Sequence, residues 1–259
     1  MKIAVLIKQV PGSDSAFRPS ENEVWIEEMQ IQYEMNESDA YALEEALLIK
    51  ENQGSGEVVV VSMGPSARVP KVIREALAKG ADRAIHVVEE GPLETDPYQI
   101  AKILSESIKS ESFDLILSGL QSMDLGMGQT GVLIGSMLGM STATLAMATE
   151  IKGDKIRVKR ELESGWFQWV TLPLPACLSI QSGINTPRYP SLKGIMGAKK
   201  KEIKTINKAD VQLNESLQTV NRIYSLKTDK KTEFIEGEPD SQVARLMDVL
   251  RSEVKVLGA

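Results

Sequence analysis

The stretch DLILSGLQSMDLGMGQTGVLIGSML, residues Asp114–Leu138, decides the fold of this chain. Its apolar residues Leu115–Leu117 predict a buried strand, and after a glycine-rich loop a helix is expected to begin near Gln129 or Thr130. Such a loop presents unpaired backbone N–H groups and the positive end of a helix dipole, which together stabilise a bound phosphate or another anion. Gly126–Gly131 matches G-x-G-x-x-G only formally, because it lies far from the first strand of the chain. A glycine-bearing turn without a ligand therefore remains an open alternative to an anion site.

Strands that alternate with helices precede this stretch. Runs of apolar residues predict three further buried strands, at Lys2–Lys8, Glu57–Met63 and Ala84–Val88. Amphipathic helices are expected to begin near Asn36–Asp39, Ser66 and Asp96-Pro97. This alternation predicts an α/β fold with a parallel sheet flanked by helices. Ligands on such sheets lie beyond the C-terminal strand ends, so we expect a nucleotide to contact four loops: Gln9–Gly12, Met35–Asp39, Met63–Ser66 and Gly119–Gly131.

The pattern changes in the second half of the chain. Short strands are expected at Leu145–Ile151, Lys155–Leu162, Trp166–Leu172 and Ala176–Ile180, which together predict an antiparallel addition. The region after Asn207 is polar and extended until a terminal helix at about Asp240–Val254, whose apolar stripe contains Val243, Leu246, Met247 and Leu250. This stripe could cover its own domain or clasp a partner. We therefore divide the chain into residues 1–206 and a C-terminal arm, residues 207–259.

Composition and charge exclude several classes of protein. A net charge of −6 argues against a general nucleic-acid binder, which needs a basic surface. The single cysteine and single histidine exclude a disulfide within the chain and the usual zinc or iron–sulfur ligand sets, and no metal site is expected. Cys177 lies in an apolar run and His86 in a predicted strand, so we interpret both as structural. Because the sequence has no secretory signal pattern and no apolar run of roughly 20 residues, we expect a cytoplasmic protein without membrane insertion.

Several segments together resemble the beta subunit of electron transfer flavoprotein, and they occur in the order typical of that family. They are Val5–Gln9, Met35-Asn36 with Leu43–Ala46, Val61–Pro65, Ala76–Arg83, Gly119–Gly131, Val158–Pro175, Asn185–Leu192, Ile195-Met196 and Lys199–Lys201. The departures are small, since Ser164 stands where the family prefers glycine or an acid and Cys177 replaces an aliphatic residue. The resemblance covers nearly the whole chain.

The resemblance implies a Rossmann-like fold of the adenine nucleotide alpha hydrolase type and a heterodimer with an alpha subunit. The alpha subunit would hold most of the redox-active FAD, whereas this subunit would hold AMP as a structural nucleotide. The family positions that match AMP-binding residues are Leu6, Asn36, Glu37, Ser38, Asp39, Met63, Gly119, Gln121, Ser122, Met123, Asp124, Gly128, Gln129, Thr130 and Gly131. The chain would then be an electron carrier without catalytic residues of its own.

The resemblance also implies partners. Electrons would come from acyl-CoA or other flavin dehydrogenases and pass to a quinone-linked oxidoreductase. A recognition loop, residues 184–198, would dock the dehydrogenase through Tyr189, Leu192, Ile195 and Met196, and the C-terminal arm would pack on the alpha subunit.

Two alternatives remain open. An electron-bifurcating relative would hold a second FAD in place of AMP, although the retained Gln129–Gly131 favours AMP. A stand-alone nucleotide-binding regulator or NAD enzyme of similar fold is the other.

Overall fold

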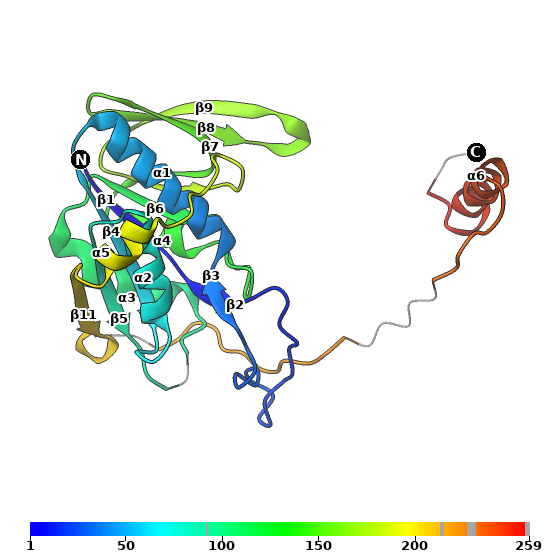
Figure 1. The fold of residues 1–259 in the computed structure, drawn as a ribbon, viewed down its shortest axis with the longest axis horizontal. Coiled ribbons are helices and arrows are strands. Elements are labelled where there is room, and N and C mark those ends of the chain that lie inside the picture. The colour runs from blue at the N-terminus through cyan, green and yellow to red at the C-terminus, as the bar shows by residue number, and fades with distance from the viewer. Residues whose placement is uncertain (92, 213–214, 227–231, 257–259) are drawn as a thin grey trace. The chain divides into compact units, whose positions relative to one another are not determined.

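One sheet carries the fold (Figure 1). The computed structural model describes residues 1–91, 93–212, 215–226 and 232–256. Within these ranges a nine-stranded sheet has the order β11-β5-β4-β1-β6-β10-β7-β8-β9. Its strands are β1 (Lys2–Leu6), β4 (Glu57–Gly64), β5 (Arg83–Val88), β6 (Leu115–Gly119), β7 (Ser141–Lys152), β8 (Lys155–Glu161), β9 (Phe167–Pro173), β10 (Ala176–Ile180) and β11 (Ile203–Asn207). The helices are α1 (Glu37–Gln53), α2 (Val69–Lys79), α3 (Pro97–Ile108), α4 (Thr130–Met137), α5 (Leu192–Ala198) and α6 (Pro239–Asp248).

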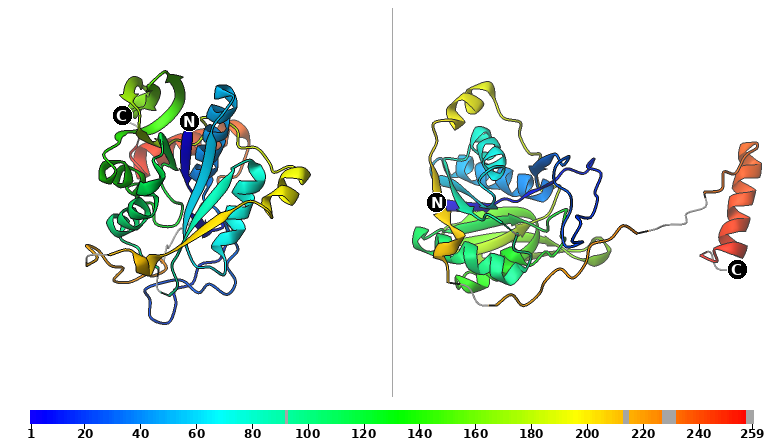
Figure 2. Two further views of the ribbon diagram at one scale, coloured as in Figure 1. Left: turned by 90° about the vertical axis from the view of Figure 1, so that its left-hand side faces the viewer. Right: turned by 90° about the horizontal axis from the view of Figure 1, so that it is seen from below.

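The two faces of the sheet bury alternate residues of each central strand. In β1, Ile3 and Val5 pack against α1 and α2, whereas Ala4 and Leu6 pack toward α3 and α4. Because successive side chains of a strand point to opposite faces, a strand covered on both sides must be apolar throughout. Figure 2 shows the sheet between these two pairs of helices. The continuous apolar runs therefore predicted the buried strands correctly, and the expected α/β class is confirmed.

One predicted pairing is wrong. Ala176–Ile180 was expected in the antiparallel addition, but as β10 it lies parallel between β6 and β7. All five of its residues are buried, which is typical of a central parallel strand rather than of an antiparallel ribbon with one wet face. The antiparallel addition consists of β7, β8 and β9.

The structure contains two further elements. Ile203–Asn207 forms the edge strand β11, which pairs in parallel with β5. A small antiparallel hairpin joins β2 (Gln9–Pro11) to β3 (Tyr33–Met35). The second helix begins at Val69 rather than near Ser66.

The chain forms two compact units, Met1–Ile223 and Tyr224–Ala259. The second unit contains α6, and none of its described residues is buried. Residues 213–214, 227–231 and 257–259 of the proposed arm lie outside the described residues. Among the residues that are described, no helix combines the length and the apolar character needed to cross a bilayer.

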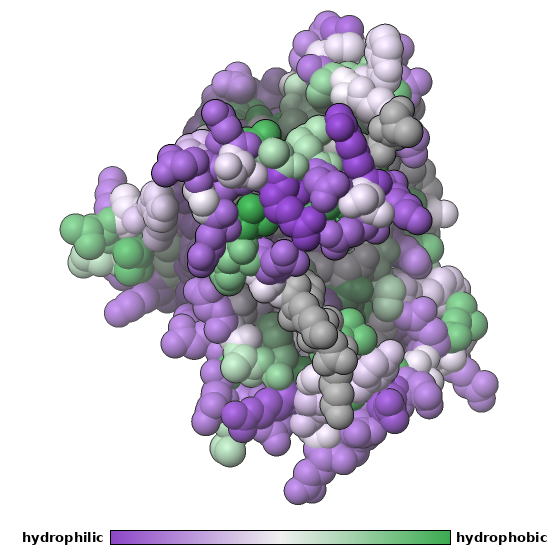
Figure 3. All heavy atoms as spheres, turned by 90° about the vertical axis from the view of Figure 1, so that its right-hand side faces the viewer, coloured by the Kyte–Doolittle hydropathy of each residue, from purple (hydrophilic) through white to green (hydrophobic). Residues whose placement is uncertain are grey.

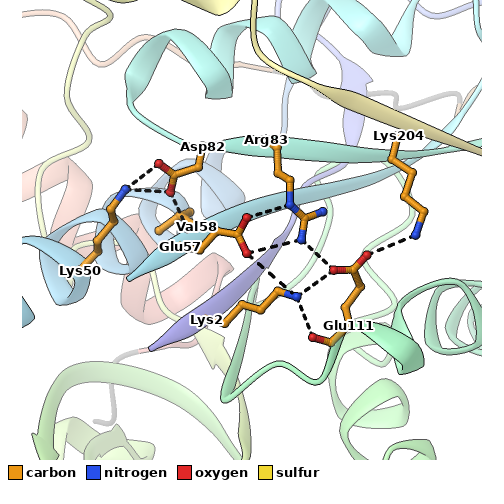
Figure 4. A network of polar contacts seen from close by, with 8 residues as sticks. All are labelled: Lys2, Lys50, Glu57, Val58, Asp82, Arg83, Glu111 and Lys204. Carbon is orange, nitrogen blue, oxygen red and sulfur yellow. Dashed lines mark hydrogen bonds and ion pairs between the residues drawn. The ribbon is translucent and has the colours of Figure 1, made fainter. Parts of the chain in front are cut away.

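A network of charged side chains joins the N-terminal ends of the parallel strands (Figure 4). Glu111 accepts hydrogen bonds from Lys2 Nζ at 2.8 Å and from Arg83 at 2.7 Å, and Lys204 Nζ lies 3.2 Å away. Arg83 also donates to Glu57 at 2.8 Å. The hydrogen bond from Lys2, then those from Arg83 and Lys204, lower the pKa of Glu111 to about 2, although burial opposes this shift.

We expect Glu111→Gln to lower the free energy of unfolding by on the order of 1–3 kcal/mol at neutral pH, because it removes charged hydrogen bonds. The pKa of the folded state lies below the ordinary value of 4.5, so this stabilisation is present above pH 4.5 and is lost as the pH falls toward 2. Denaturant unfolding across that range measures the difference. Glu106→Gln is the control, since Glu106 and Lys109 form an exposed pair of little expected effect. An equal decrease in the free energy of unfolding of the two variants would contradict a stabilising role for the Glu111 network.

Candidate functional site

A cavity of about 170 Å³ lies at the C-terminal ends of β1, β4 and β6, beside the first turn of α4. All four loops expected from the strand ends contribute to it. Of the residues expected to bind nucleotide, those that line it are Leu6, Asn36, Asp39, Met63, Gly119, Gln121, Ser122, Asp124, Gly128, Gln129, Thr130 and Gly131. Glu37, Ser38 and Met123 lie outside the lining.

The N-terminus of α1 holds the loop that follows β6. Asn36 Nδ2 donates to the carbonyl oxygen of Gln121 at 3.0 Å, and its Oδ1 accepts the backbone N–H of Met123 at 3.0 Å. Ser38 Oγ donates to the same Gln121 oxygen at 2.8 Å. Ser38 therefore supports the cavity wall from behind, whereas Glu37 is exposed and the side chain of Met123 is 51% exposed.

Asp39 joins the ends of β1 and β6. Its carboxyl group accepts the backbone N–H of Lys8 at 2.7 Å and that of Gly119 at 3.0 Å. Burial raises the pKa of Asp39 to about 7, although these two donors and Asn36 oppose the shift. A Cβ at position 119 would lie 2.3 Å from Asp39 Oδ1 and 2.2 Å from Ser38 Oγ. Glycine is therefore required where β6 meets α1.

An ion pair crosses the cavity wall. Lys8 Nζ lies 2.7 Å from Asp124 Oδ1. Burial would raise the pKa of Asp124, but the charge and hydrogen bond of Lys8 outweigh it and lower that pKa. Lys8 also lines the cavity, although it was not expected there from the sequence. Its position at the C-terminal end of a predicted strand is the signal that could have found it.

Three residues that were not expected at the cavity, Trp25, Tyr33 and Arg68, also line it. The guanidinium carbon of Arg68 lies 4.0 Å from the centre of the Tyr33 ring, and Gln9, from the expected loop Gln9–Gly12, lines the cavity too. Burial raises the pKa of Tyr33 to about 12, so its hydroxyl stays neutral. Apolar and aromatic side chains with a small number of polar groups are typical of the lining of a small-molecule or cofactor site.

The first turn of α4 lies at the cavity, where Gln129, Thr130 and Gly131 line it. Gln129 is the N-cap residue, and its side chain gives no hydrogen bond to that turn. Backbone N–H groups at such a helix start are available to solvent or to a ligand, and the helix dipole favours an anion there. This is the geometry that the strand–loop–helix pattern predicted.

Cys177 and His86 are structural, as expected. Cys177 is buried beneath α4 and its Sγ lies 3.2 Å from the carbonyl oxygen of Gly131. Burial raises the pKa of this thiol to about 12, which excludes a thiolate nucleophile at neutral pH. His86 is buried with Nε2 3.0 Å from the carbonyl oxygen of Gly64, and burial lowers its pKa.

Comparison with known proteins identifies the family. A family model described as "Electron transfer flavoprotein domain" matches residues 24–211. "Electron transfer flavoprotein subunit beta" of Methylophilus methylotrophus is 38% identical over 260 residues, which span 96% of this chain and 98% of the relative. The chain belongs to the electron transfer flavoprotein family, as a beta subunit.

Electron transfer flavoprotein beta subunits of distant organisms agree with this assignment. The Bacillus subtilis relative is 36% identical over 229 residues, covering 86% of this chain and 88% of its own. The Homo sapiens relative is 35% identical over 226 residues, covering 85% and 88%. The family expected from the sequence motifs is therefore confirmed.

The loop expected to dock a dehydrogenase in this electron transfer flavoprotein subunit is exposed at its tip. Tyr189 is 93% exposed, Leu192 83% and Met196 74%, while Ile195 is 45% exposed. Leu192 begins α5, where Ser191 Oγ accepts the N–H of Gly194. In the view of Figure 3, apolar residues lie in small groups among mostly hydrophilic ones. Single exposed apolar residues are ordinary, but several along one short loop and helix form a larger apolar surface.

Proposed function

We propose that this chain is the nucleotide-binding subunit of an electron-carrying heterodimer. An alpha subunit holds most of the FAD, and the cavity of this subunit holds AMP. The observation that carries the proposal is the cavity itself, in which an apolar wall meets the uncapped first turn of α4. The AMP phosphate lies on backbone N–H groups near Gln129–Gly131, where the helix dipole favours an anion.

In this proposal the chain makes and breaks no substrate bonds. FAD supplies the redox chemistry, and this subunit supplies a rigid frame and a docking surface. The exposed tip of the recognition loop binds an acyl-CoA or other flavin dehydrogenase, which delivers the electrons. A quinone-linked oxidoreductase then receives them.

We expect one AMP and one FAD per heterodimer. The measurement is chromatography of nucleotides released by acid from the purified, co-expressed heterodimer. A matched variant, Gly131→Ala, places a Cβ 2.3 Å from Ser118 Oγ at the proposed phosphate position, so it should lower AMP content and leave FAD content unchanged. Two FAD and no AMP would contradict the proposal and favour the bifurcating alternative. No nucleotide at all in this subunit would contradict both.

A further inference from the structure

Arg188, in the approach to the recognition loop, is held by two carboxylates of α1. Its backbone N–H and its Nε donate to Glu44 Oε2 at 3.0 and 2.9 Å, and its Nη2 donates to Glu44 Oε1 at 2.8 Å. Its Nη1 donates to Glu51 Oε1 at 2.6 Å. The planar guanidinium group thus bridges two successive acidic positions on one face of α1, a geometry that lysine cannot reproduce.

The Glu44–Arg188 ion pair is partly removed from water: the side chain of Arg188 is 32% exposed, whereas that of Glu51 is 54% exposed. The side chain of Glu44 is only 7% exposed. The hydrogen bonds that Arg188 donates to Glu51 and then to Glu44 raise the pKa of Arg188, and the hydrogen bond from Arg188 lowers the pKa of Glu51. A buried ion pair is weak evidence for stability, because well-packed apolar residues stabilise as much or more. What it does provide is a fixed direction for the segment that carries it.

A second contact attaches the same segment to the same helix. Asn185 Nδ2 donates to the carbonyl oxygen of Tyr41 at 3.1 Å and to Glu45 Oε2 at 3.0 Å. Glu45 also accepts a hydrogen bond from Thr149 Oγ1 at 2.5 Å. Residues 185–188 are therefore bound to four residues of α1: Tyr41, Glu44, Glu45 and Glu51.

The segment bound to α1 passes into the exposed docking tip within one residue. Pro187 and Pro190 restrict the backbone on either side of Arg188-Tyr189. Tyr189, directly after the clamped arginine, is 93% exposed. An apolar tip on a rigid base binds a partner without first losing conformational freedom, and this preorganisation increases affinity.

We propose that Arg188 is a positioning residue of the docking surface: clamped by Glu44 and Glu51, it holds the segment from Tyr189 to Met196 in its binding conformation. Arg188 acts through the tip and does not itself contact the dehydrogenase. This inference rests on the proposed function, because it assigns a cause to the geometry of the proposed docking loop.

The experiment uses the flavin-loaded heterodimer with an acyl-CoA dehydrogenase as the electron donor. We expect Arg188→Met to raise the KM for the flavoprotein by roughly tenfold, the cost of immobilising one or two side chains and their loop. The kcat and the flavin content should stay unchanged. Glu51→Gln keeps the bond to Glu44 and should give a smaller rise in KM, and this variant serves if Arg188→Met fails to fold. Lys109→Met, which breaks the exposed pair with Glu106, should leave KM unchanged.

The decisive measurement repeats Arg188→Met or Glu51→Gln in a Leu192→Ala background. If the clamp acts through the tip, it should add little to the KM once the leucine is absent. Full additivity, or an unchanged KM in the single clamp variants, would overturn the inference while leaving the docking role intact. An unchanged KM in Leu192→Ala alone would instead overturn the docking role assigned under the proposed function.

Discussion

A chain that ends at Ile223 is expected to lose its alpha subunit. The deleted unit, Tyr224–Ala259, includes α6, on which no described residue is buried. Phe234, Val243 and Leu246 expose large apolar side chains, and a segment this polar cannot form a core of its own. Burial of two or three such side chains against a partner would contribute on the order of 3–6 kcal/mol, which corresponds to about 10²- to 10⁴-fold in the dissociation constant.

Analytical ultracentrifugation of the co-expressed subunits measures this change, and FAD content gives a second readout. The cut leaves β11 and the rest of the first unit intact, whereas a cut before Asn207 would remove part of a strand that pairs with β5. The AMP content of the shortened subunit is the control, because the cavity lies wholly in the first unit. Substituting Val243 and Leu246 by serine should weaken the heterodimer in the same direction. A shortened chain that still forms a stable heterodimer would contradict the expected packing of Tyr224–Ala259 on the alpha subunit.

Leu192→Ala should lower the affinity for the dehydrogenase by on the order of 1–3 kcal/mol, the effect of removing an anchor from a partner's apolar pocket. Because Leu192 is 83% exposed, the isolated subunit loses few contacts, and its melting temperature should stay nearly constant. Electron transfer from the dehydrogenase measures the loss, with heterodimer stability and flavin content measured in parallel.

Met29→Ala is a suitable control for this variant. Met29 is fully exposed on a different loop, and its removal should change neither docking nor stability. A loss of stability with intact docking in Leu192→Ala would show that the leucine supports local packing instead.

The fold was largely predictable because its main signals are local. The apolar run Leu115–Leu117 and the glycine-rich loop after it predicted a strand, and α4 begins at Thr130 as expected. The direction of β10 was not predictable in this way, because its pairing with β6 brings together residues far apart in sequence. A buried strand of five residues, four of them apolar, has the same local pattern in either orientation.

In the candidate site, too, the residues with a local sequence signal were predicted and those brought together only by folding were not. Strand-end loops could be selected from the α/β pattern, so the residues of Gly119–Gly131 were expected at the cavity. Tyr33 and Arg68 could not be selected from the sequence, because they meet only when the hairpin of β2 and β3 folds beside the start of α2. Side chains that hold a wall from behind, such as Ser38, also carry no signal that separates them from ligand contacts.

Helix α1 serves both regions of the molecule, and its register constrains how the sequence can change. Asp39 at its first turn joins the strand ends at the cavity, and Glu44 holds Arg188 below the docking tip. An α-helix turns by about 100° per residue. Inserting or deleting one residue between Asp39 and Glu44 would rotate Glu44 and Glu51 away from Arg188, while Asp39 would keep its place at the cavity. The number of residues between them is therefore as strictly constrained as their identities, although none of the intervening residues binds a ligand in the proposed function.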